Sequence, residues 1–118
     1  MSWRLVAAIA VGGSTGALMR AGILDLFASW WSVALLAVNV SGSFALGLAV
    51  TMLIERPTVR AGFGTGFCGG FTSMSTFAVD VASRLHDGDV LAALILVVAT
   101  VVGATTGALA GLRLGIRR

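Results

Sequence analysis

The stretch GGFTSMSTF, Gly69 to Phe77, decides how the fold of this sequence is to be interpreted. Two adjacent glycines precede a cluster of hydroxyl side chains, and the whole stretch lies inside a segment that is otherwise apolar enough to span a membrane. Glycine adds backbone freedom and hydroxyl groups compete for backbone hydrogen bonds, so a helix is weak here. We therefore predict that the helix breaks near this cluster, which consists of Thr72, Ser73, Ser75 and Thr76.

A helix break at membrane depth is tolerated only where protein or a water-filled cavity satisfies the freed backbone groups. The break therefore predicts a site for an ion or a small substrate. The alternative is that each hydroxyl bonds back to a carbonyl of its own helix, which is the usual behaviour of an isolated serine or threonine. Four hydroxyls beside a Gly-Gly pair favour the site.

The rest of the chain has the composition of a membrane protein. Of its 118 residues, 58% are hydrophobic and only 11% are charged, and the mean hydropathy is +1.01. A helix that crosses the hydrocarbon core needs about 20 residues. We predict an all-α membrane protein of one domain, 1–118, with four transmembrane helices, the third of them broken near its middle. The expected spans are residues 5–27, 33–54, 61–83 and 90–112.

The arginines predict how the chain is oriented. Four spans place both termini and the link between the second and third spans on one side, which carries Arg4, Arg56, Arg60, Arg113, Arg117 and Arg118. The opposite loop carries Arg84 alone, and Arg20 lies in the outer part of the first span. Because positively charged loops stay in the cytoplasm, both termini are expected there, in the plasma membrane of a bacterium.

Glycines recur every four residues in three of the four segments. This spacing leaves one helix face without side chains, so that another helix can approach closely. The pattern does not say whether the partner helix belongs to the same chain or to another subunit. The glycines concerned are Gly12, Gly16, Gly62, Gly66, Gly70, Gly103, Gly107, Gly111 and Gly115.

Two polar side chains stand out in the first two spans. Asn39 needs hydrogen-bond partners in the bilayer, either in another helix or in a transport pathway. Arg20 either extends to the interface or makes an entrance attractive to anions. Asp25 and Asp80 lie near segment ends and are expected at the interface. The chain has no catalytic constellation of Ser, His and Asp and no metal-ligand spacing, so an enzyme is not expected.

Three motifs, in order along the first three spans, resemble the CrcB or Fluc family of fluoride channels. They are GGSTGALMR, VNVSGSF and GFCGGFTSMSTF, which end at Arg20, Phe44 and Phe77. The resemblance implies a passive fluoride channel built as an antiparallel dimer with two pores. It also implies a structural sodium ion at the dimer centre, bound by the backbone carbonyls of Gly69 and Thr72.

The resemblance further implies which residues meet the ion. Asn39, Ser75, Thr76 and Phe77 match pore-facing positions, and Arg20 matches an arginine of the vestibule. Fluoride is small and strongly hydrated, so hydroxyl and amide donors must replace its water, and ring edges with partial positive charge can assist without trapping it. The chain departs from the family motif at two positions of the same pore wall, Ser73 and Met74, where threonine and phenylalanine are usual.

Two other functions remain open at this point. A small proton-coupled drug exporter would have a similar size, but it needs a carboxylate at mid-membrane in the first span. A non-transporting accessory membrane subunit would need only the glycine faces. The uneven arginine distribution also disfavours insertion of one chain in both orientations, so we expect an oppositely oriented paralogue as the dimer partner.

Overall fold

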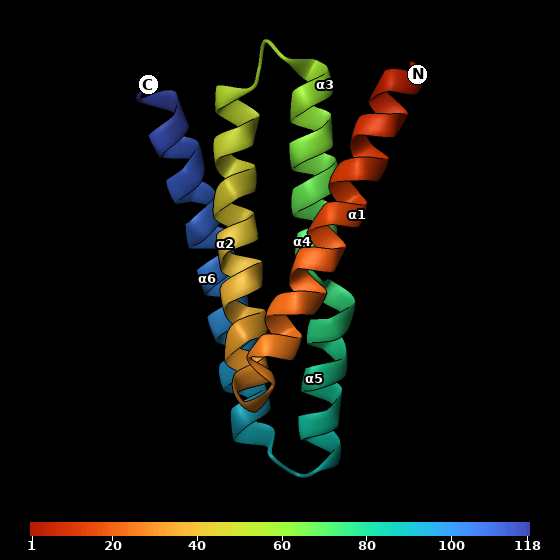
Figure 1. Cartoon of the computed structure of the whole chain (residues 1–118). Coiled ribbons are helices and arrows are strands. Elements are labelled where there is room, and N and C mark those ends of the chain that lie inside the picture. Colours follow the sequence, from red (N-terminus) through yellow and green to blue (C-terminus); the bar gives the residue numbers. More distant parts are fainter.

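The protein is an all-α bundle of long helices that run side by side (Figure 1). The computed structural model describes residues 1–118. In chain order the elements are α1 (Trp3–Leu26), η1 (Ala28–Trp30), α2 (Trp31–Met52), α3 (Pro57–Arg60), η2 (Ala61–Cys68), α4 (Gly69–Phe71), α5 (Met74–His86) and α6 (Val90–Ile116).

The third span is broken, as predicted. Elements α3, η2 and α4 form its first half and α5 forms its second half. Between them Thr72 (φ −81°, ψ 155°) and Ser73 (φ −147°, ψ 107°) are extended. Gly69 itself is helical (φ −63°, ψ −39°), so the break lies after the glycine pair and not at it.

The first half of this span contains a feature that the sequence did not predict. Residues Ala61–Cys68 form a π-helix, which is wider than an α-helix and is often associated with functional sites. Three glycines, Gly62, Gly64 and Gly66, lie in this segment, and a Cβ atom on each would come within 3.3 Å of α1 or α2. The wide turn therefore coincides with the closest helix packing on this side of the bundle.

The glycine spacing mediates packing within the chain. Helix α1 packs along η2 and α4, and α2 packs along α6. A Cβ atom on Gly16 would collide with the backbone of Phe67, and one on Gly70 would collide with the backbone of Gly13. On the other side, Gly111 meets the backbone of Phe44 in the same way. Both crossings thus bring backbone against backbone, where dispersion contacts replace the hydrophobic effect that lipid cannot supply.

The outer surface of the bundle is apolar. Only 18 of the 118 residues are buried within the chain, so most large hydrophobic side chains face outward. Helices α1 and α6 and the segment Ala28–Met52 are long and apolar enough to cross a membrane. Such a surface is suited to lipid or to another subunit, and the chain is a multi-pass membrane protein.

Charge is distributed unevenly between the two ends of the bundle. Both termini and α3 lie at one end (Figure 1), together with the six arginines that the sequence assigned to that side. Arg84 belongs to the other end and forms an ion pair with Asp80, with 3.1 Å between Nε and Oδ1. The positive charge therefore gathers at the end that carries the termini.

We predict that Gly16→Ala destabilises the protein whereas Gly22→Ala does not. The added methyl group at Gly16 has no room against Phe67, and overpacking of this kind costs about 1–3 kcal/mol. Gly22 has nothing within 4 Å of the same position, so alanine there should stabilise the helix by about 0.5–1 kcal/mol. Denaturant unfolding in detergent measures both values, and equal changes in the two variants would contradict this account of the crossing.

Candidate functional site

The backbone groups freed at the break are bound by side chains from two other helices. The amide N–H of Ser73 donates to Oδ1 of Asn39 at 2.8 Å, and Nδ2 of Asn39 reaches the Ser73 carbonyl at 3.5 Å. Both residues are buried. Asn39, which lies in α2, therefore acts on the extended backbone as a neighbouring strand would.

Arg20 of α1 binds the same segment. Its Nη1 donates to the carbonyl of Gly70 at 2.7 Å and to that of Thr72 at 2.9 Å. The close crossing of Gly16 over Phe67 and Phe71 brings α1 near enough for this contact. The sequence left Arg20 between two possibilities, the interface and an anion entrance, and its nearest partners prove to be carbonyls of the third span.

The hydroxyl cluster lies at the start of α5. Ser73 is the N-cap of this helix, and its Oγ accepts from the amide of Thr76 at 3.1 Å. The same Oγ donates to Thr76 Oγ1 at 2.7 Å and lies 3.3 Å from Ser75 Oγ. Three hydroxyls thus form one connected group beside the break. Thr72 is not part of it, because its Oγ1 bonds back to the Cys68 carbonyl at 3.0 Å.

The two residues predicted to hold sodium border one hollow. It has a volume of about 340 Å³ and is lined by Gly42, Ser43, Leu46, Gly64, Thr65, Cys68, Gly69 and Thr72. The Gly69 carbonyl accepts no hydrogen bond, since Ser73, whose amide would bond to it in a continuous helix, is turned toward Asn39. A free carbonyl oxygen therefore lies at the break.

The two candidate residues of the pore wall in α5 have different surroundings. The Phe77 ring packs against the buried cluster of Leu24, Ala34 and Leu35, where α1 and α2 meet. The Met74 side chain is 73% exposed in the single chain. Within one chain, then, Met74 has little protein around it, and any wall it forms needs another molecule beside it.

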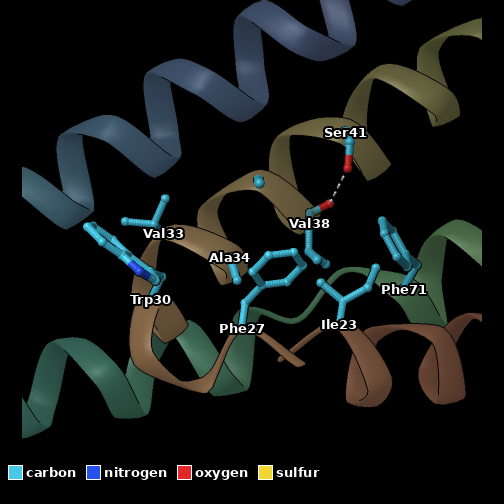
Figure 2. Close-up of a pocket in the computed structure, with 9 residues that line it drawn as sticks. Ile23, Phe27, Trp30, Val33, Ala34, Val38, Ser41 and Phe71 are labelled. Atoms are coloured by element: carbon cyan, nitrogen blue, oxygen red, sulfur yellow. Dashed lines mark hydrogen bonds between the residues drawn. The ribbon is translucent and has the colours of Figure 1, made fainter. Parts of the chain in front are cut away.

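A larger hollow on the bundle is apolar. It has a volume of about 510 Å³ and opens between the end of α1 and α2, with Phe71 at the side nearest the break (Figure 2). Its only polar side chain is Ser41, whose hydroxyl donates to the carbonyl of Val38 at 3.2 Å. Apart from this hydroxyl and the indole N–H of Trp30, the lining is hydrocarbon, so the break, where freed backbone groups and hydroxyls gather, is the more polar site.

A second polar group lies toward the end of α5. Asp80 accepts from Ser32 at 2.7 Å through Oδ2, and Arg84 Nη2 donates to the same serine hydroxyl at 2.6 Å. Together with the ion pair between Arg84 and Asp80, this group joins α5 to the start of α2. The sequence indicated Asp80 only as an interfacial residue. The four-residue spacing from Asp80 to Arg84 was the available signal for the pair.

Comparison with known proteins assigns the family. Residues 7–112 match the family described as CrcB-like protein, Camphor Resistance (CrcB). The chain belongs to the CrcB family. The resemblance of the three motifs is thereby confirmed across nearly the whole chain.

Curated proteins named as fluoride-specific ion channels are similar to this chain along most of their length. A protein of Bacillus subtilis named fluoride-specific ion channel FluC 2 is 35% identical, over 97% of this chain and 89% of its own. A Rhodococcus jostii protein named fluoride-specific ion channel FluC 1 is 41% identical, over 95% of this chain and 86% of its own. A Pyrococcus furiosus protein named fluoride-specific ion channel FluC is 37% identical, over 86% of this chain and 87% of its own.

Proposed function

We propose that this chain is a subunit of a channel that lets cytoplasmic fluoride leave a bacterial cell passively and so reduces its toxicity. The observation that carries the proposal is the broken third span, whose freed backbone and hydroxyl groups gather beside Asn39. Its relatives, which match most of the chain, are named as fluoride-specific ion channels. The protein is a transporter in this proposal, and no catalysed reaction is required of it.

The hydroxyl cluster has the chemistry that fluoride needs. Fluoride loses its hydration shell only where donors replace the water, and Ser73, Ser75 and Thr76 each carry an O–H that can turn toward an anion. The Ser73 and Thr76 hydroxyl oxygens lie 2.7 Å apart, so one anion could accept hydrogen bonds from both hydroxyls in place of the bond between them. Asn39 contributes through Nδ2, which is held only by the 3.5 Å contact with Ser73.

Phe77 and Arg20 complete the proposed pathway. The edge of the Phe77 ring carries partial positive charge and can face fluoride without binding it too tightly to leave. Arg20 has no carboxylate partner, so its charge adds a positive potential at the vestibule. Met74 occupies the position where the family motif has a second ring, and a thioether is only a weak acceptor with no comparable positive edge.

The break also fits the proposed sodium ion. Sodium prefers oxygen ligands, as other hard cations do, and the free carbonyl of Gly69 supplies one at the rim of the 340 Å³ hollow. The carbonyl of Thr72 is the second proposed ligand. It already accepts from Arg20, so it would share its two lone pairs between a guanidinium and the ion. Sodium would serve there as a structural charge that joins subunits.

The dimer is proposed on the exposed apolar surface and on the exposed Met74, which lacks a neighbour in the single chain. An antiparallel partner would complete two pores. Because six arginines gather at one end of the bundle, the partner is best supplied by an oppositely oriented paralogue. The pore that contains Met74 in place of a ring is then the weaker of the two.

The rival functions are less well supported. A proton-coupled exporter needs a carboxylate in the middle of the first span, and Asp25 in α1 is exposed and close to the end of that helix. An accessory subunit would explain the glycine crossings but not the connected hydroxyls at the break. Neither accounts for a buried asparagine paired with extended backbone.

We predict rapid fluoride efflux from liposomes that contain the purified protein with its partner subunit, and no comparable chloride efflux. Thr76→Val removes one pore hydroxyl at nearly constant volume and should slow fluoride efflux by about tenfold or more, since a hydrogen bond to an ion is lost. Thr106→Val is the matched control, because Thr106 is exposed on α6 and bonds to its own helix at Val102. A fluoride electrode follows the efflux.

Equal efflux of fluoride and chloride, or none of either, would end the proposal. If Thr76→Val and Thr106→Val slowed fluoride efflux equally, the hydroxyl cluster would have no specific role in the pore. Replacing sodium by an organic cation on both sides of the same liposomes tests the structural ion, whose loss should lower fluoride efflux.

We also predict that the chain expressed alone inserts in one orientation, with both termini in the cytoplasm, and conducts fluoride only with an oppositely oriented partner. Impermeant labelling of a cysteine added at each terminus measures the orientation, in a background in which Cys68 is replaced. Met74→Phe should raise the efflux of the active pair, because a ring edge returns to the pore wall. Labelled termini on both faces, with full conduction by the chain alone, would reject the paralogue.

A further inference from the structure

The peptide unit between Thr72 and Ser73 is bound from two helices at once. Its carbonyl, that of Thr72, accepts from Arg20 of α1 at 2.9 Å. Its amide N–H, that of Ser73, donates to Asn39 of α2 at 2.8 Å. A trans peptide unit is planar, with its carbonyl and its N–H on opposite sides, and the chain has no cis peptide bond. Arg20 and Asn39 therefore bind opposite sides of one planar peptide unit.

Each of these contacts replaces a bond that a continuous helix would make. The Gly70 and Thr72 carbonyls would accept from the residues four positions later, but Thr76 donates to Ser73 Oγ and Met74 donates to no backbone carbonyl. One nitrogen of Arg20 serves both carbonyls. The Ser73 amide would donate to Gly69, and Asn39 accepts it instead. Without these two side chains, the buried amide of Ser73 and the partly buried carbonyls of Gly70 and Thr72 would lose these partners, which is costly.

Arg20 has no other strong partner in the chain. The chain forms one ion pair, between Arg84 and Asp80, and Arg20 takes no part in it. Its guanidinium has five N–H donors, of which those on Nη2 and Nε make no hydrogen bond within the chain. The side chain thus binds the backbone through Nη1 alone, and its other donors have no partner within the chain.

We propose that Arg20 and Asn39 are positioning residues that act as one unit and fix the orientation of the Thr72–Ser73 peptide. The unit decides that the carbonyl faces α1 and the amide faces α2, and it holds Ser73 where its hydroxyl caps α5. Rotation of this peptide unit would break both hydrogen bonds together, so the contact of Arg20 and the contact of Asn39 depend on each other. This role concerns the backbone at the break and does not rest on which anion the protein carries, although the same two side chains belong to the proposed ion pathway.

Hydrogen exchange of the Ser73 amide in the full chain, followed by NMR in lipid nanodiscs, tests the unit. Asn39→Leu should accelerate exchange at Ser73 directly. Arg20 makes no contact with that amide. Arg20→Met should nevertheless accelerate its exchange by roughly tenfold to a hundredfold, since a charged hydrogen bond to the same peptide unit is lost. Arg113→Met is the control, because Arg113 lies in α6 at the end that carries the C-terminus, and it should leave exchange at Ser73 unchanged.

The double variant Arg20→Met with Asn39→Leu should exchange little faster than the faster single variant, because one unit can be broken only once. Additive effects would overturn the proposal, and so would a wild-type rate at Ser73 in Arg20→Met. If Arg20→Met does not fold, Arg20→Gln serves in its place, since its shorter side chain also lacks the charge and falls short of the carbonyls. A wild-type rate in Arg20→Gln would equally overturn the proposal.

Discussion

Unpaired backbone groups are costly in a bilayer, and the two extended residues Thr72 and Ser73 free several of them from the helix. Lipid offers no hydrogen bonds to replace the helical ones, so side chains from elsewhere in the chain pair with the Ser73 amide and with the carbonyls of Gly70 and Thr72. These side chains are those of Asn39 and Arg20, and the hydroxyl of Ser73 accepts from the amide of Thr76. The polar chemistry proposed for transport is thus the same chemistry that keeps the third span from closing into a continuous helix.

The glycines make this arrangement possible because they set how closely the helices approach. Helix α1 crosses the third span with Gly16 against Phe67, and Gly70 meets Gly13 a few residues from the break. A methyl group at either crossing would push α1 away and carry the guanidinium of Arg20 with it. Packing and function are therefore linked through small residues, and the second crossing, between α2 and α6, supports the helix that carries Asn39.

The sequence predicted the helical class, the membrane setting, the family and the break, because composition and local helix weakness are properties of short stretches. It placed the break near the hydroxyl cluster, but it did not predict which residues would be extended. Gly69 and Gly70 are the weakest helix formers in the stretch, yet both are helical, and the chain extends at Thr72 and Ser73, where Asn39 and Arg20 offer partners. These partners are 34 to 52 residues away in the chain, so no local pattern could have indicated them. The π-helix of Ala61–Cys68, which packs closely against α1, was likewise not predicted.

The contact between Arg20 and the carbonyl of Thr72 is the central claim of this account, and solid-state NMR in lipid bilayers can measure it directly. The guanidinium nitrogens of arginine and the carbonyl carbon of threonine would be labelled with ¹⁵N and ¹³C in the otherwise native chain. The account predicts a dipolar coupling between them that disappears in Thr72→Ser, which removes the label from this carbonyl but keeps the hydroxyl. A fully labelled wild-type sample with no such coupling would show that the arginine does not bind the break, and would contradict the account.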